Sequence, residues 1–131
     1  MTTAKGSFEV TSWNEDVYEE LDGGCKLTRA SVEQSFSGDI DGKGAVQWLM
    51  AYRSDGTAHF VGLQRVSASV GERSGSFVLE TAGEFDGAVA SGTWAVVPGS
   101  ATAALAGLRG TGKFVAPHGP RASFELDYGF D

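Results

Sequence analysis

Two glutamines in the middle of the chain, Gln47 and Gln64, are the most specific candidates for chemistry. They flank Ser54-Asp55-Gly56-Thr57, in which Asp-Gly favours the positive φ angles of a two-residue type I′ hairpin. Such a hairpin pairs Gln47 with Gln64 and Tyr52 with His59. Because amides inside a protein must be hydrogen-bonded, the two glutamines form either a satisfied polar pair, a buried water site, or a polar spot that orients a ligand oxygen.

Other reactive groups are few. His59 and His118 are the only histidines, and no carboxylate pattern beside them suggests a zinc site. Gly110-Thr111-Gly112-Lys113 lacks the spacing of a phosphate loop and leads into a strand, so nucleotide binding is not expected. No motif indicates another cofactor or a metal, and we expect none. Glutamine is not a general base, so any catalysis here would depend on shape, desolvation and hydrogen bonding.

The spacing of the glycines indicates the strands that must position these amides. The 19 glycines and 3 prolines of this 131-residue chain separate short runs of alternating polarity, which predicts one all-β domain over residues 1–131. We expect a single antiparallel β-barrel of about eight strands. The predicted strands are Lys5 to Trp13, Lys26 to Ser37, Ala45 to Arg53, Thr57 to Val70, Arg73 to Thr81, Ala88 to Val97, Lys113 to Ala116 and Ala122 to Phe130.

Alternation in these strands predicts which side chains face the barrel interior. A second turn at Gly71-Glu72 pairs Val66 with Phe77 and Gln64 with Leu79. The terminal strands place small residues and phenylalanines on one face, and the same mixture marks the inner face of the central hairpin. The predicted ligand-binding positions of the lumen are Gln34, Phe36, Gln47, Phe60, Gln64, Phe77, Trp94 and Tyr128.

The same register leaves an apolar set on the outside of adjacent strands, formed by Trp48, Met50, Tyr52, Val61 and Leu63. An exposed apolar patch on a barrel is typical of a partner surface, so we expect a homo-oligomer, most simply a dimer. The alternative is that the Gly-rich segment from Pro98 to Phe114 covers this patch.

Composition excludes some classes of function. A net charge of −7 argues against nucleic acid as a partner. The single cysteine, Cys25, rules out an internal disulfide and suits a reducing compartment. No apolar stretch is long enough to span a membrane, and the first residues do not resemble a signal peptide. We therefore expect a cytoplasmic protein without a membrane partner.

Six runs spread over most of the chain carry a resemblance to a known family. They are Lys26-Leu27-Thr28-Arg29-Ala30, Phe36-Ser37-Gly38-Asp39-Ile40, Leu49-Met50-Ala51-Tyr52, Phe60-Val61-Gly62-Leu63, Arg73-Ser74-Gly75-Ser76-Phe77-Val78-Leu79 and Gly107-Leu108-Arg109-Gly110. Through these runs nearly the whole chain resembles a bacterial family called domain of unknown function 3224. The resemblance implies an allene-oxide-cyclase-like or dirigent-like barrel with a Gly-rich crossover, here Pro98 to Phe114, before the last strands.

Three functions follow as hypotheses. The first is a cofactor-independent cyclase or isomerase acting on a small hydrophobic molecule in the lumen. The second is a non-catalytic barrel that binds the same kind of ligand. The third is a structural oligomer with a closed core. The sequence alone leaves open whether the barrel is hollow, what the ligand is and how many subunits assemble.

Overall fold

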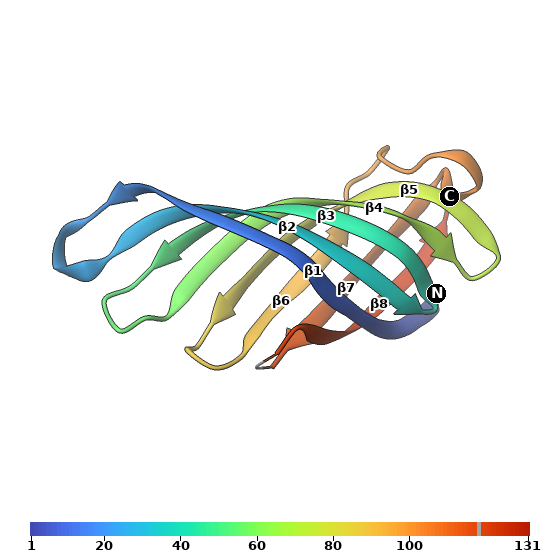
Figure 1. Ribbon diagram of the computed structural model, residues 1–131. Coiled ribbons are helices and arrows are strands. Elements are labelled where there is room, and N and C mark those ends of the chain that lie inside the picture. The colour runs from blue at the N-terminus through green and yellow to red at the C-terminus, as the bar shows by residue number, and fades with distance from the viewer. Residues whose placement is uncertain (118) are drawn as a thin grey trace.

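The strands follow one another in sequence order around a closed antiparallel barrel, and β1 pairs with β8 to complete it (Figure 1). The computed structural model describes residues 1–117 and 119–131. The strands are β1 (Thr2–Glu20), β2 (Lys26–Gly38), β3 (Ile40–Tyr52), β4 (Ala58–Val70), β5 (Arg73–Phe85), β6 (Ala90–Val96), β7 (Leu108–Ala116) and β8 (Arg121–Phe130). The predicted all-β barrel of eight strands is confirmed.

Two short 3-10 turns are the only helical elements in the described part of the chain, η1 (Asp22–Gly24) and η2 (Ala103–Leu105). No helix in this part is long and apolar enough to cross a membrane.

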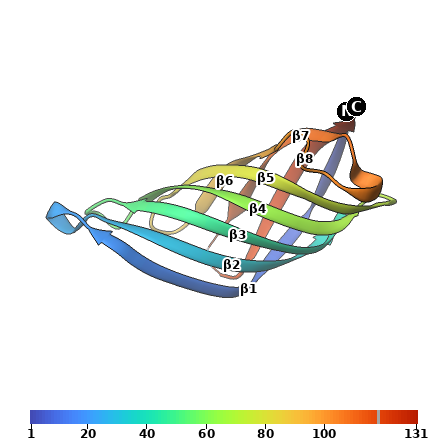
Figure 2. The ribbon, with the colours of Figure 1, turned by 90° about the horizontal axis from the view of Figure 1, so that it is seen from above.

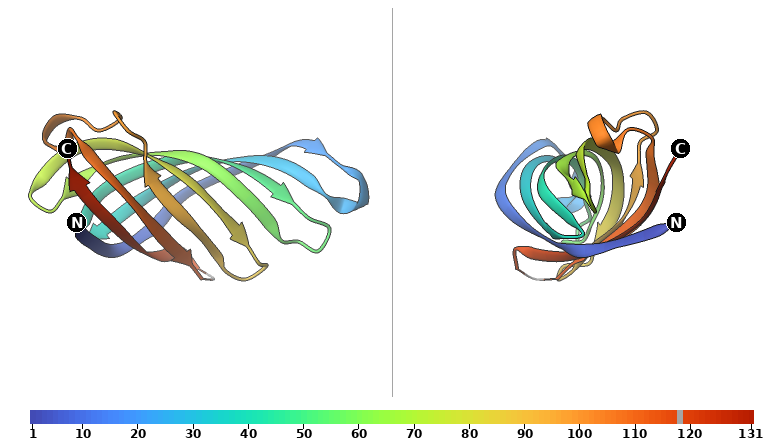
Figure 3. Two further views of the ribbon diagram at one scale, coloured as in Figure 1. Left: turned by 180° about the vertical axis from the view of Figure 1, so that it is seen from behind. Right: turned by 90° about the vertical axis from the view of Figure 1, so that its right-hand side faces the viewer.

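The barrel has two different ends. The β1–β2 hairpin projects beyond its neighbours, and the β3–β4, β5–β6 and β7–β8 connections lie along the same end, which we call the open end (Figures 1 and 2). Both termini and the β6–β7 connection lie at the opposite end, which we call the closed end (Figure 3). Ile40, Val70, Leu105 and Leu108, which come from elements at the closed end, are buried in the core.

The Gly-rich segment does not cross the barrel. β6 and β7 are neighbours, and β7 begins at Leu108, so the second half of the predicted crossover is a strand. The rest follows the edge of β5 that β6 leaves unpaired: Val97 N donates to Val78 O at 2.9 Å and Thr102 N to Ser76 O at 2.8 Å. Because this segment covers a strand edge, it does not provide the predicted cover for an outer apolar patch.

The β3–β4 hairpin, around Asp55-Gly56, has a longer loop than the sequence predicted. Arg53 N donates to Thr57 O at 2.8 Å, Gly56 N donates to Arg53 O at 3.0 Å, and Gly56 has φ +86°. These contacts describe a three-residue loop with glycine in the left-handed position, which is the next most common way to close a hairpin. The predicted two-residue turn is therefore wrong by one residue.

That one residue reverses the predicted faces of β3. Tyr52 pairs with Ala58, and Val46 takes the predicted place of Gln47 opposite Gln64. Because side chains alternate along a strand, Trp48 and Met50 point inward and are buried. The β4–β5 hairpin has the predicted register, since Val66 pairs with Phe77 and Gln64 with Leu79.

Aromatic rings fill the middle of the barrel. Trp94 lies among four phenylalanines, with ring centroids 6.1 Å from Phe8, 6.2 Å from Phe36, 5.9 Å from Phe114 and 5.5 Å from Phe124. All five side chains are buried. Contacts of this kind add about 0.5–1.5 kcal/mol per pair beyond the area they bury. This aromatic cluster separates the closed end from the open end.

Glycines on neighbouring strands leave the space that the rings occupy. A Cβ on Gly44 would lie 2.6 Å from Phe36 Cε2, and one on Gly83 would lie 2.7 Å from Phe60 Cζ. A Cβ on Gly6 would likewise lie 2.8 Å from Phe124 Cζ. Such distances are too short for real carbon contacts, so a larger residue at Gly44 forces the Phe36 ring to move. At Gly83 and Gly6 a backbone carbonyl oxygen lies closer still, so the backbone must shift as well.

We predict that Gly44→Ala destabilises the barrel by about 1–3 kcal/mol, the usual cost of overpacking a core. The contact at Gly44 is with the Phe36 ring, so the cost should shrink when Phe36 is replaced by leucine. Urea unfolding of both single variants and the double variant measures this coupling. An equal cost of Gly44→Ala with either residue at position 36 would contradict the explanation.

Candidate functional site

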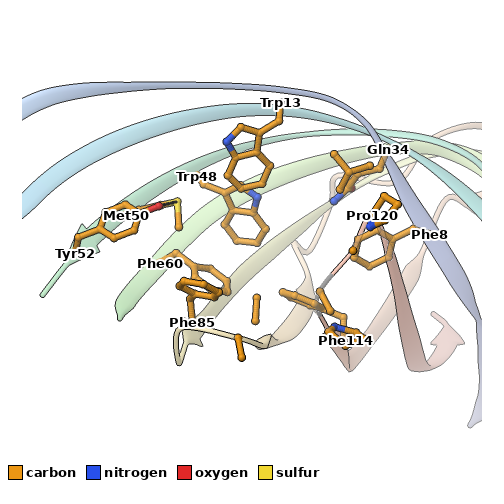
Figure 4. Close-up of a pocket in the computed structure, with 16 residues that line it drawn as sticks. Phe8, Trp13, Gln34, Trp48, Met50, Tyr52, Phe60, Phe85, Phe114 and Pro120 are labelled. Atoms are coloured by element: carbon orange, nitrogen blue, oxygen red, sulfur yellow. Dashed lines mark hydrogen bonds between the residues drawn. The ribbon is translucent and has the colours of Figure 1, made fainter. Parts of the chain in front are cut away.

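A cavity of about 410 Å³ occupies the open end of the barrel (Figure 4). Its walls come from every strand except β8, and from the β5–β6 and β7–β8 connections. Most of the lining is apolar. The aromatic side chains that face it are Phe8, Trp13, Trp48, Tyr52, Phe60, Phe85 and Phe114. The barrel is therefore filled in one half and hollow in the other.

The aromatic cluster supplies the floor of the cavity. Phe8 and Phe114 belong to the cluster around Trp94 and also line the cavity. Trp48 and Phe60 meet edge to face on the wall, with centroids 4.6 Å apart. These rings are held by core packing, so this part of the cavity is preformed.

A β-bulge in β1 turns further side chains toward the cavity. The β1–β2 register shifts between Val10 and Ser12, which inserts one extra residue in β1. Before the shift, Phe8 and Val10 face inward, and after it Trp13 pairs with the buried Val32. Bulges commonly re-aim side chains near functional sites. Here the bulge brings Trp13 into the lining and places Glu15 on the same face.

Glu15 accepts three hydrogen bonds at the cavity mouth. Thr28 Oγ1 donates to Glu15 Oε2 at 2.6 Å, and Tyr52 Oη donates to the same oxygen at 2.9 Å. Trp13 Nε1 donates to Glu15 Oε1 at 3.1 Å. The donors come from three strands, so this carboxylate ties the projecting hairpin to β3. We call Trp13, Glu15, Thr28 and Tyr52 the mouth network.

Tyr52 is the titratable group that this arrangement changes most. Burial, followed by the hydrogen bond to Glu15 and its negative charge, raises the pKa of Tyr52 from 10.0 to about 12. Over the face of the Tyr52 ring, Lys26 Nζ lies 5.0 Å from the centroid in a cation–π contact. At neutral pH Tyr52 is therefore a fixed hydroxyl whose proton is directed to Glu15.

One amide lies on the deeper wall of the cavity. Gln34 lines the cavity and is buried together with Gln64, whose Nε2 donates to Gln34 Oε1. That bond uses the Gln34 carbonyl oxygen, so its N–H groups are the donors left to face the cavity. A buried amide pair was predicted, but Gln34 takes the place expected for Gln47.

The predicted lumen residues occupy different places. Gln34 and Phe60 line the cavity, while Gln64 lies behind Gln34. Phe36, Phe77 and Trp94 are buried in the core without lining the cavity, and Tyr128 is half-buried with its ring centroid 6.0 Å from that of Phe130.

Gln47 is on the outer surface, where Ser31 Oγ donates to its Oε1 at 3.0 Å. The cause is the one-residue shift in β3 described above. Ligand binding by any of the predicted lumen positions stays a prediction.

The predicted partner surface is divided by the barrel wall. Trp48 and Met50 are buried inside and Tyr52 lines the cavity, whereas Val61 and Leu63 are exposed outside. The five side chains therefore form no common face. Self-association stays a prediction, without the surface that was expected for it.

His59 does not belong to the cavity lining. His59 lies on the outer surface as predicted, and its Nδ1 contacts Glu84, which also accepts from Arg53 Nη2 at 2.7 Å. His118 lies outside the described residues. Among the described residues, no group of three or more His, Cys, Asp or Glu side chains is placed to hold a metal ion.

The sequence reasoning missed the mouth network because it did not include the bulge. Trp13 lies at an odd position after inward residues at even positions, and this break in parity is the one signal that the sequence contained. Glu15 follows Trp13 with the same parity. A charged residue on the inner face of a strand is not suggested by alternation alone.

Comparison with known proteins assigns the chain to a family. The profile of DUF3224, described as "protein of unknown function", matches residues 4–128. The chain belongs to the DUF3224 family. A similar solved structure is a DUF3224 protein of unknown function from Shewanella oneidensis MR-1, with a TM-score of 0.85 and 28% identity over 100% of this chain and 98% of that one. No curated protein matches.

The raised pKa of Tyr52 in this DUF3224 barrel predicts a pH effect. Since the pKa is about 12 in the folded state against 10.0 without its surroundings, folding favours the protonated phenol. The resulting stabilisation is complete below pH 10.0 and is lost as the pH rises toward about 12. The phenolate absorbance is measured as a function of pH for the native protein and for Tyr52→Phe, and the difference between the two curves gives the titration of Tyr52. Glu15→Gln should lower the pKa of Tyr52. If Tyr52 titrates at the same pH as the other tyrosines of the native protein, its pKa is not raised and the prediction is wrong.

The amide pair of the DUF3224 barrel predicts a second, independent result. Gln64→Leu leaves Gln34 Oε1 without its donor and should cost about 1–3 kcal/mol. Replacing both glutamines by leucine removes both polar groups and should cost less than the sum of the single changes. Thermal or urea unfolding gives the comparison. Additive costs would show that the two amides do not depend on each other.

Proposed function

We propose that the open half of this barrel binds a small apolar molecule. The observation that carries the proposal is the cavity of about 410 Å³ with predominantly apolar lining. Sites for small molecules commonly have volumes of roughly 300–1,000 Å³, with a few polar groups that fix orientation. Here those groups are the Gln34 amide on the deeper wall and the Tyr52 hydroxyl at the mouth.

The aromatic rings favour a ligand with a rigid or cyclic apolar body. Trp48 and Phe60 form an edge-to-face pair on one wall, and Phe8 and Phe114 form the floor. Rings held in this way offer flat surfaces at low entropic cost, because they are already ordered before the ligand enters. Gln34 can donate to an oxygen of the bound molecule.

A cofactor-independent cyclase or isomerase is the second candidate. Glu15 and Tyr52 form a carboxylate–hydroxyl pair beside the cavity, which is the observation in its favour. A general acid works best with a pKa near the working pH, however, and the pKa of Tyr52 is about 12. Binding is therefore better supported than catalysis. The cavity argues against the third hypothesis, a closed core.

The expected cytoplasmic location and the expected self-association stay predictions. Neither is needed for the binding proposal, because the described lining comes from a single chain.

The proposal predicts that N-phenylnaphthylamine, an uncharged probe whose fluorescence increases in apolar surroundings, binds to the protein. Ala90 lines the cavity from β6, so Ala90→Phe should fill part of the space and weaken binding about tenfold or more. Fluorescence titration gives the dissociation constants.

Ala51→Phe is the matched control, because Ala51 is exposed on the outer surface. It adds the same side chain without entering the cavity, so binding should be unchanged. Thermal unfolding of both variants establishes that they are folded. If the native protein does not bind the probe, or both variants bind it as tightly as the native protein, the proposed function is wrong.

A further inference from the structure

The mouth network restricts the chemistry of the molecule that the cavity accepts. Tyr52 connects the mouth network to the cavity, since its ring lines the cavity and its hydroxyl contacts Glu15. Its second neighbour is Met50 Sδ at 3.8 Å, a weak acceptor. What the Tyr52 oxygen can offer a ligand therefore depends on where its one proton goes.

Glu15 determines the direction of that proton. A carboxylate has acceptors only, so Tyr52 must donate to it, as Thr28 and Trp13 also do. Once the proton is directed to Glu15, the lone pairs of Tyr52 Oη are what remains for a ligand. The mouth thus presents an acceptor and needs a donor, such as a hydroxyl or N–H group, on the bound molecule.

The charges around the mouth disfavour an anionic ligand. The described lining residues include no lysine, arginine or histidine. The nearby ammonium group of Lys26 lies over the Tyr52 ring. Beyond Glu15, the projecting hairpin carries four exposed acids, Asp16, Glu19, Glu20 and Asp22, against one cation besides Lys26, the exposed Arg29 opposite Asp16. A carboxylate entering this region would lose water and gain no cation from the described lining, which is unfavourable.

We infer that the cavity selects an uncharged molecule with a hydroxyl or N–H group, which donates to Tyr52 Oη at the mouth, and that it rejects the corresponding carboxylate. This inference rests on the proposed binding function and adds the class of ligand. A fatty acid or another apolar acid is thereby a poor ligand, whereas an apolar alcohol of the same shape is a good one.

Three molecules with one carbon skeleton test the inference. Cymene is the hydrocarbon, cuminyl alcohol carries a hydroxyl group, and cuminate carries a carboxylate. Each is titrated against N-phenylnaphthylamine bound to the native protein. We expect cuminyl alcohol to displace the probe at about threefold to tenfold lower concentration than cymene, as one net hydrogen bond allows. Cuminate should be the weakest of the three.

Two variants identify the groups responsible. Tyr52→Phe keeps the ring and removes the hydroxyl, so the advantage of the alcohol over cymene should disappear. Glu15→Gln removes the negative charge, so cuminate should bind more tightly relative to cymene. Thermal unfolding shows that each variant is folded, and the ranking of the three ligands on the native protein decides the question even if a variant does not fold.

The possible failures are distinct. Absence of probe binding to the native protein would overturn the proposed function. Normal probe binding with cuminyl alcohol no better than cymene, or with cuminate as good as the alcohol, would overturn the inference about ligand class alone. An alcohol advantage that persists in folded Tyr52→Phe would overturn the role of Tyr52.

Discussion

The interior of this barrel depends on large aromatic rings that lie against glycines of neighbouring strands. Gly6 pairs with Phe124 and Gly92 with Phe114 directly across adjacent strands, and any Cβ at these glycines would meet the ring within 3 Å. A glycine within a strand costs roughly 0.5–1 kcal/mol relative to alanine. The barrel offsets this cost by burying whole rings, each of which contributes far more apolar area than a methyl group.

The same packing explains why only one half of the barrel is hollow. Trp94 and its four phenylalanine neighbours fill the cross-section at one level, and side chains such as Leu105 are buried toward the closed end. Toward the open end, the inward positions of β6 and β7 carry alanines, Ala90 and Ala116, which leave room that the rings of Phe60 and Phe85 do not fill. The cavity is therefore a consequence of residue size along a few strands, and its floor is part of the core.

Alternation predicted most of the barrel from the sequence, because each strand buries one face. It placed Phe60, Gln64 and Phe77 inward correctly, and the Gly71-Glu72 turn gave the correct register. It failed for Gln47 because Asp-Gly fits both a two-residue loop and a three-residue loop with glycine left-handed. The choice between them depends on packing of β3 against the rest of the barrel, where Trp48 is favoured inside over a glutamine. Local turn residues contain no information about that competition.

The bulge in β1 matters more for the proposed binding site, because it determines which polar groups reach the cavity. Without the extra residue between Val10 and Ser12, Trp13 and Glu15 would face the outside of the projecting hairpin. Tyr52 would then lie half-buried beside the cavity without its acceptor, and its hydroxyl would be free to donate to a ligand. With the bulge, the same hydroxyl is directed to Glu15, and the proposed ligand would meet it as an acceptor. In the proposed binding site, a single inserted residue thus reverses the hydrogen-bonding character of the cavity mouth, and composition or charge alone could not have indicated it.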